Sequence, residues 1–158
     1  MKLLGINDYD ISSYKDPAIF LSFPYCSFKC GSEVCQNRHL RFADPLDISL
    51  DYIEQLLDSS PFVKAIVCGG LEPLDSWEEL IGFISYIRHR HPEPIVIYTG
   101  YEENEIQDKV QTLSLYENII IKFGRYTPKN KPHYDVILGV DLASDNQYAK
   151  IFNPIGGY

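Results

Sequence analysis

The chain has 158 residues, of which 45% are hydrophobic and 23% charged, and its formal net charge is −8 at pH 7. This length suits one domain with a core of its own, so we expect a single domain over residues 1–158. A strongly acidic chain repels phosphate backbones and anionic lipids, which argues against nucleic acid or a membrane as a partner. The apolar stretch at the N-terminus is too short for a signal peptide and no apolar run approaches the ~18 residues of a spanning helix, so we expect a cytoplasmic protein.

Short apolar runs alternate with segments of helical periodicity along the chain. The runs predict strands over residues 18–23, 65–68, 95–99, 118–123 and 135–138. The periodic segments predict helices over residues 48–57 and 102–113, and a third helix that a capping box opens at 76–79 and His91-Pro92 ends.

This alternation predicts parallel strands joined by right-handed crossovers. The chain is too short for eight strand–helix units, which take about 250 residues. We therefore expect an α/β fold: a partial, open β/α barrel of about five to six mostly parallel strands.

Three cysteines, Cys26, Cys30 and Cys35, directly follow the first expected strand. In a cytoplasmic protein, clustered cysteines favour metal or redox chemistry over disulfides. Thiolates select iron–sulfur clusters, zinc or copper(I), and three of them leave one coordination position open for chemistry. A zinc site completed by His39 is the alternative. Cys68, at the end of an apolar run, is expected to be a small buried hydrophobe.

Two further motifs follow expected strands: Gly69-Gly70-Leu71-Glu72-Pro73 and Thr99-Gly100-Tyr101. The carboxyl ends of parallel strands meet at one edge of a sheet, and ligands of such folds gather there. We therefore expect both motifs and the cysteine loop to form one site.

Together these motifs resemble the radical S-adenosylmethionine (SAM) superfamily and, within it, the activating protein of anaerobic (class III) ribonucleotide reductase. The resemblance rests on the cysteine loop with Asn37 two residues after its last cysteine, on the two strand-end motifs, and on a late Ser144-Asp-Asn146-Gln147. The cysteine spacing here is C-x3-C-x4-C, whereas the superfamily usually has C-x3-C-x2-C, so the chain resembles a divergent branch.

The resemblance implies a fold of radical SAM type and a 4Fe-4S cluster bound by Cys26, Cys30 and Cys35, with SAM chelating the fourth iron. Reductive cleavage of SAM then yields a 5′-deoxyadenosyl radical, and the cofactors carry that chemistry. The residues implied to contact SAM are Gly69, Gly70, Glu72, Thr99, Tyr101 and Asn37.

Each SAM contact has a physical reason and a plainer alternative. Glycines 69 and 70 let the backbone approach the methionyl group, and Glu72 accepts hydrogen bonds from the SAM ammonium unless it is merely solvated. Tyr101 reaches the ribose or adenine, or is a surface aromatic residue. Asn37 points toward SAM or caps local backbone. Asn146 and Gln147 are expected either at the site or as partners of loop backbone.

The resemblance implies a glycyl radical enzyme, anaerobic ribonucleotide reductase in the first place, as the target, and a flavodoxin- or ferredoxin-type protein as electron donor. A partial barrel without an added domain leaves its open side uncovered, and a docked protein would shield the radical from water. Two alternatives remain: a radical SAM enzyme acting on a small molecule or peptide, and a non-catalytic metal-binding module. The tail, residues 156–158, is expected to be a flexible terminus.

Overall fold

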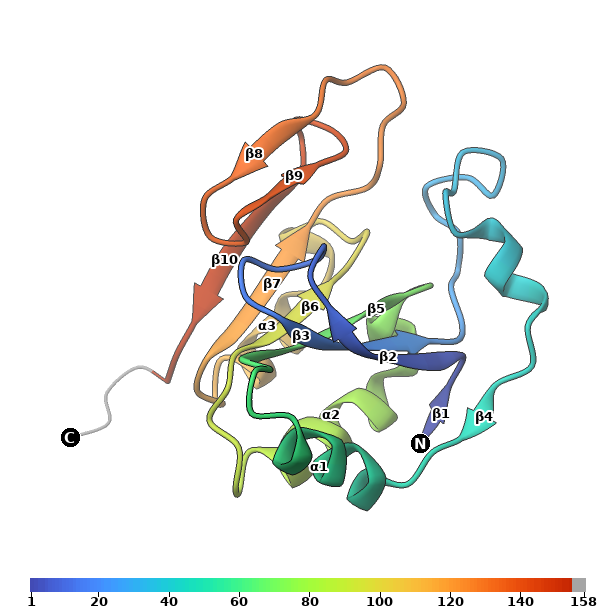
Figure 1. Ribbon diagram of the computed structural model, residues 1–158. Coiled ribbons are helices and arrows are strands. Elements are labelled where there is room, and N and C mark those ends of the chain that lie inside the picture. The colour runs from blue at the N-terminus through green and yellow to red at the C-terminus, as the bar shows by residue number, and fades with distance from the viewer. Residues whose placement is uncertain (155–158) are drawn as a thin grey trace.

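The computed structural model describes residues 1–154, so the expectation for the tail at 156–158 lies outside it. Its centre is a six-stranded sheet with the order β10-β7-β6-β5-β3-β2 (Figure 1). These strands are β2 (Gly5–Asp10), β3 (Ala18–Phe23), β5 (Ala65–Gly70), β6 (Ile95–Tyr98), β7 (Ile119–Phe123) and β10 (Tyr148–Phe152). The prediction of a mixed α/β fold with a mostly parallel sheet is confirmed.

The four inner strands, β3, β5, β6 and β7, pair in parallel, and β2 and β10 add antiparallel edges. The inner strands are apolar runs because both faces of the sheet are covered, as is usual for parallel sheets. The register sets Ile66 beside Ile95, and Ile95 beside Ile119. A layer of β-branched side chains therefore runs across the centre of the sheet.

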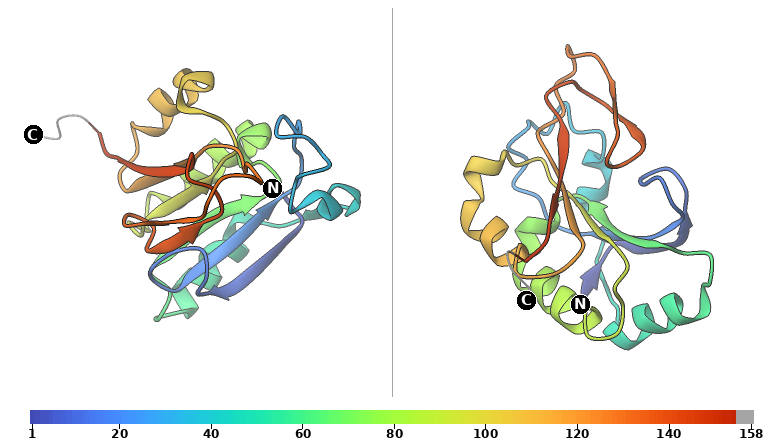
Figure 2. Two further views of the ribbon diagram at one scale, coloured as in Figure 1. Left: turned by 90° about the horizontal axis from the view of Figure 1, so that it is seen from above. Right: turned by 90° about the vertical axis from the view of Figure 1, so that its left-hand side faces the viewer.

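Helices cover one face of this sheet, and a hairpin with the segment after β2 covers the other (Figure 2). The helices are α1 (Leu50–Ser59), α2 (Trp77–Ile87) and α3 (Gln107–Leu113), with short 3-10 turns at Arg38–Phe42, Pro73–Ser76 and Glu103–Glu105. The hairpin consists of β8 (His133–Asp135) and β9 (Val140–Leu142), and β1 (Lys2–Leu3) pairs with β4 (Leu46–Asp47) beside the sheet. No helix within residues 1–154 has the length and apolarity to cross a bilayer.

The predicted strand at 135–138 is wrong, since the chain turns there between β8 and β9. One carboxylate oxygen of Asp135 accepts the backbone N–H groups of Ile137 and Leu138, each at 2.9 Å. Gly139 follows with a φ of 70°, which favours glycine. The segment therefore reverses direction and places Leu138 against the sheet face.

The predicted capping box at the start of α2 is also wrong. Ser76 occupies the N-cap position, but its side chain makes no capping hydrogen bond. The carboxylate of Glu79 instead accepts the backbone N–H of Lys2 at 2.9 Å. This contact joins the N-terminal strand β1 to the helix layer.

All four parallel strands end at the same edge of the sheet, and the loops that leave this edge carry the motifs. Figure 1 shows the cysteine loop after β3 and the loop after β7 rising beyond that edge. Phe23, the last residue of β3, pairs with Gly70 at the end of β5. The N–H of Thr99, just after β6, donates to the carbonyl of Lys122 on β7 at 2.9 Å.

Candidate metal centre

The three clustered cysteines lie on one loop and line one cavity of about 90 Å³. Cys26, Cys30 and Cys35 are all free thiols and partly buried. Cys68 on β5 is fully buried and packs in the helix-facing core, away from this cavity. The structure therefore separates three potential ligands from one structural cysteine, as the sequence predicts.

These sulfurs do not converge on a single point. Within residues 1–154, no group of three or more His, Cys, Asp or Glu side chains is close enough to hold one metal ion. His39 lines a separate depression with Arg38 and Phe42, so a zinc site of three cysteines and His39 is not assembled. A cluster offers a separate iron to each thiolate, so its ligands need only face a shared space.

Burial raises the pKa of the Cys26 thiol to about 11. Burial also raises the pKa of Cys30, and the neighbouring Cys35 adds to the effect. Both thiols are protonated at neutral pH in the metal-free chain, whereas soft-metal ligation needs thiolates. Metal binding by these cysteines is therefore coupled to the release of protons.

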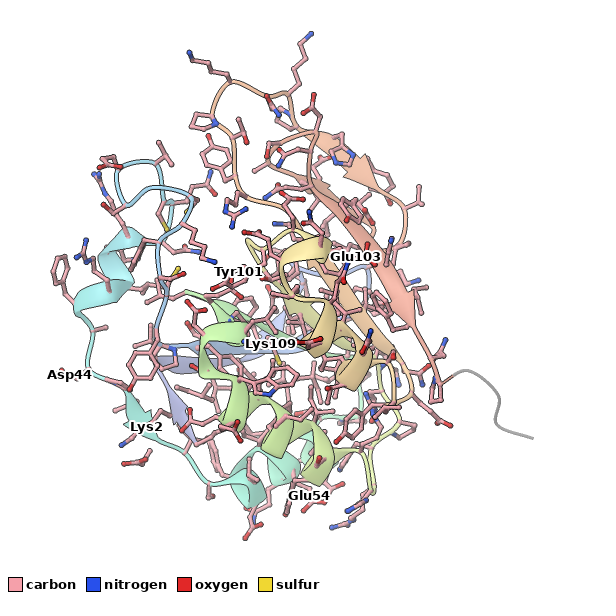
Figure 3. All side chains as sticks on the ribbon, turned by 180° about the vertical axis from the view of Figure 1, so that it is seen from behind. Lys2, Asp44, Glu54, Tyr101, Glu103 and Lys109 are labelled. Carbon is pink, nitrogen blue, oxygen red and sulfur yellow. The ribbon has the colours of Figure 1, made fainter. Side chains whose placement is uncertain are left out.

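Asp75 holds the cysteine loop against the end of β6. One of its carboxylate oxygens accepts the backbone N–H of Ser27 at 2.6 Å, and the other accepts the hydroxyl of Tyr101 at 2.6 Å. Lys29 places its ammonium 4.7 Å from the centre of the Tyr101 ring, which lies beside the loop in Figure 3. Tyr101 is therefore part of the wall of the site and not a free surface aromatic residue.

Asn37 joins the far end of the cysteine loop to β5. Its side-chain amide donates to the carbonyl oxygen of Gly70 at 3.1 Å, and Asn37 also lines the cavity. The acceptor lies 33 residues away in the sequence, so Asn37 does not cap the backbone of its own loop.

Both glycines of the Gly-Gly motif pack closely against β3, and Gly70 is required there by its positive φ and its backbone contacts. A Cβ at Gly69 would lie 2.7 Å from the ring of Phe20. Gly70 has a φ of 95°, and a Cβ there would lie 2.5 Å from the Ser22 hydroxyl and 2.8 Å from the Phe23 nitrogen. Sequence reasoning ascribed these glycines to a close approach of ligand, whereas the packing of β3 against β5 is itself a sufficient reason.

Glu72 is a buried carboxylate, 4% exposed, so the alternative of a solvated side chain is wrong. Its two oxygens accept the backbone N–H groups of Leu74 at 3.2 Å and Gly100 at 2.9 Å. The Thr99 side chain also hydrogen-bonds to it, but burial prevails and raises the pKa of Glu72 to about 7. Glu72 lines the cysteine cavity, where a cationic group would stabilise its charged form.

A larger cavity of about 380 Å³ adjoins the cysteine cavity. Cys30, Cys35, Asn37, Gly70, Leu71, Gly100 and Arg125 line both cavities. The volume falls in the range of about 300–1,000 Å³ typical of sites for small molecules. Thr99 and both glycines of the Gly-Gly motif line the larger cavity, so the expected SAM contacts all line one or both of these adjoining cavities.

Lys122 is a further residue of the larger cavity that sequence reasoning missed. Its side chain is buried on β7, and its ammonium donates to the carbonyl of Gly124 at 2.9 Å. Burial lowers the pKa of Lys122 to about 8. Its only sequence signal is a lysine within an otherwise apolar strand, which usually indicates a solvated edge position.

Asn146 and Gln147 support the loop after β7. The Asn146 amide donates to the carbonyl of Arg125 at 2.8 Å, and the Gln147 amide donates to the carbonyl of Gly124 at 3.2 Å. Both residues are thus partners of loop backbone, and Gln147 also lines the larger cavity, so for Gln147 both expectations hold. They fix the wall of the larger cavity from the side of β10.

The sequence model of a family described as 4Fe-4S single cluster domain matches residues 18–140. Comparisons with curated proteins and with solved structures found no significant match. The matched region includes the cysteine loop, both strand-end motifs and the four parallel strands. The chain therefore belongs to the 4Fe-4S single cluster domain family.

Proposed function

We propose that the protein is a small radical SAM iron–sulfur enzyme. The observation that carries the proposal is the adjacency of the two cavities: the cavity of the three free cysteines shares seven lining residues with a larger cavity lined by the strand-end motifs. The same proposal takes the six-stranded sheet as a partial, open barrel of radical SAM type, with its ligands at the carboxyl ends of the strands.

The chain's own groups fit a cluster with SAM beside it. Cys26, Cys30 and Cys35 supply three thiolates and leave one iron free for another ligand. Glu72 supplies a buried carboxylate for a ligand ammonium, and burial raises its pKa in the metal-free chain. When bound, the reduced cluster supplies the electron that cleaves SAM to a 5′-deoxyadenosyl radical.

A glycyl radical enzyme, such as anaerobic ribonucleotide reductase, is the target that we propose. The motif order supports this assignment, because it is similar to the reductase-activating proteins along most of the chain. The larger cavity also supports it, because it lies at the surface and is lined in part by Ser12, Ser13 and residues 140–143. A docked protein would complete the exclusion of water that a reactive radical needs.

A radical SAM enzyme acting on a small molecule or peptide is the second candidate. The size of the larger cavity, about 380 Å³, favours it, since a peptide side chain or small substrate needs such a space. Binding to a purified glycyl radical enzyme, measured without oxygen, separates the two candidates. A stable complex and a glycyl radical signal by electron paramagnetic resonance support the first.

Oxygen-free reconstitution with iron and sulfide, followed by SAM and a strong chemical reductant, tests the proposed function. We expect 5′-deoxyadenosine from the wild type and none from Cys30→Ala. Cys68→Ala is the matched control, because this cysteine is buried in the helix-facing core and lines neither cavity. A wild type that binds the cluster but never cleaves SAM would leave a non-catalytic cluster protein as the conclusion.

A further inference from the structure

A cationic segment follows the cysteines on the surface of this acidic chain. Residues 26–42 contain Lys29, Arg38 and Arg41 but a single carboxylate, Glu33, whereas the whole chain has 14 basic and 22 acidic residues. All three cationic side chains are exposed. We call Lys29, Arg38 and Arg41 the cationic rim. The local charge is thus opposite in sign to that of the protein.

The cationic rim has carboxylates nearby, with Glu33 beside Arg38 and Arg41, but it forms no ion pair with those of the described chain. Within residues 1–154, none of its three members forms an ion pair, whereas Lys2, Arg125 and Lys150 are each paired with an acid. The electrostatic potential of the rim therefore extends into solvent, where it attracts anionic surfaces.

The rim also surrounds exposed aromatic surface and reaches the cysteines. The Arg41 guanidinium lies 5.2 Å from the ring centre of Phe28 and 5.1 Å from that of Phe42, which is 80% exposed. Arg41 and Cys26 line one depression of about 240 Å³, and Lys29 lines the cysteine cavity itself. Arginine and aromatic side chains are the residue types most enriched at protein interfaces.

An electron for a cluster in this loop has to enter from another molecule. Beyond the three ligands, the described residues contain one further cysteine, Cys68, which is buried alone in the core. The described chain thus has no cysteine set for a second cluster that could relay electrons. The rim is an exposed surface on the cysteine loop and the 3-10 turn that follows it, and one of its members, Lys29, lines the cysteine cavity.

We infer that the cationic rim is the docking surface for an acidic one-electron carrier protein, which reduces the cluster through the cysteine loop. The inference rests on the proposed function and deepens it by assigning the partner's chemistry and place of contact. One electron leaves the reduced carrier, which is oxidised, and enters the 4Fe-4S cluster, which is reduced by one electron. No atom or proton is transferred.

Such a contact should be weak, fast and sensitive to salt. Electron-transfer complexes are at the small end of protein interfaces, below about 1,200 Å² of buried surface. Charges at the periphery of such interfaces act mainly on the association rate, and salt screens them over about 10 Å at 0.1 M. A neutral chemical reductant does not depend on this steering.

Binding of a redox-inert partner tests the docking surface without relying on catalysis. The probe is an acidic [2Fe–2S] ferredoxin whose irons are replaced by gallium, titrated into the reconstituted protein at low and high salt. We expect Arg38→Glu and Arg41→Glu each to weaken binding at least about tenfold at low salt, with the difference lost at high salt. Arg41→Gln, which removes one charge instead of reversing it, should have a smaller effect in the same direction.

Lys64→Glu is the matched control, because Lys64 is exposed and lies where β5 begins, at the opposite edge of the sheet. It changes the net charge as much as Arg41→Glu, and we expect unchanged binding. Equal weakening in Lys64→Glu overturns the inference, since it would report net charge alone. Unchanged carrier binding in both arginine variants also overturns the inference. The same holds if these variants lose binding of a target enzyme but still bind the carrier.

Reduction kinetics keep this inference separate from the proposed function. With a chemical reductant, cluster reduction and SAM cleavage should be equal in the wild type and the arginine variants, whereas reduction by native ferredoxin should slow at least about tenfold. A wild type that fails to cleave SAM with the chemical reductant refutes the proposed function. If the wild type cleaves SAM but the arginine variants bind the carrier as tightly as the wild type does, the docking surface is refuted.

Discussion

The side chain of Asn37 donates a hydrogen bond of 3.1 Å to the carbonyl oxygen of Gly70. This contact ties the residue just beyond the last cysteine to the end of β5. At the near end of the loop, the carboxylate of Asp75 holds the backbone N–H of Ser27 at 2.6 Å. The cysteine loop is therefore anchored at both ends to the strand edge that carries the Gly-Gly motif.

Asn37→Ala should loosen the loop and reduce retention of the cluster. The lost hydrogen bond is worth about 1 kcal/mol, so we expect roughly a fivefold faster loss of iron at 25 °C. Iron content and visible absorbance, followed after oxygen-free gel filtration into chelator, measure this rate. Gln36→Ala, a neighbour without an assigned side-chain hydrogen bond, is the control. Equal iron loss from both variants would mean that the Asn37 contact does not hold the loop.

Gly70→Ala should destabilise the fold by about 1–3 kcal/mol. Its φ of 95° is unfavourable for alanine, and the new Cβ would meet the backbone nitrogen of Phe23 at 2.8 Å. Gly82→Ala is the matched control: this residue lies inside α2 with nothing within 4 Å of a built Cβ, so alanine should stabilise by up to about 1 kcal/mol. Urea unfolding of the two metal-free variants checks both signs.

Glu72 should make the metal-free fold less stable as the pH rises from 4.5 toward 7. Its pKa is raised from 4.5 to about 7, so in this window the folded state binds more protons than the unfolded state. Stability then falls with pH, by at most about 3 kcal/mol over the window. Urea midpoints between pH 4.5 and 7.5 should show this decline reduced in Glu72→Gln, and parallel curves for both proteins would contradict it.

Lys122→Met should raise the free energy of unfolding at pH 7, by at least about 1 kcal/mol, because it removes a buried ammonium that forms no ion pair in residues 1–154. The pKa of Lys122 is lowered from 10.5 to about 8 by burial, so the wild type gains stability as the pH rises through that window. The advantage of the variant should therefore shrink between pH 8 and 10, which thermal unfolding measures. A variant less stable than wild type at pH 7 would indicate that the ammonium is well compensated in the fold.

The inner strands could be predicted because each is an apolar run covered on both faces. The edge strand β2, Gly5–Asp10, could not, since its centre, residues 7–9, is solvent-exposed and the strand has no apolar run. The segment 135–138 was instead predicted as a strand although it forms a turn, because its run Val136-Ile137-Leu138 has the composition of a strand. Val136 is 80% exposed, however, and the Asp135 carboxylate bends the backbone into a turn.

The candidate site shows the same division. The cysteines and strand-end motifs could be identified because their residue types and spacing carry the chemistry directly. Asp75 and Lys122 could not, because their roles depend on contacts with Ser27 and with the cavity that only the folded chain creates. The sequence also could not predict that a side chain at position 70 would clash with β3.

The burial of the Cys26 thiol affects how easily the metal-free protein is oxidised. Oxidants attack the thiolate, and with a pKa of about 11 this cysteine is almost entirely in the unreactive protonated form at neutral pH. A newly made chain should therefore survive brief contact with air with Cys26 still reduced. Iron and sulfide added afterwards should then still find Cys26 available as a ligand.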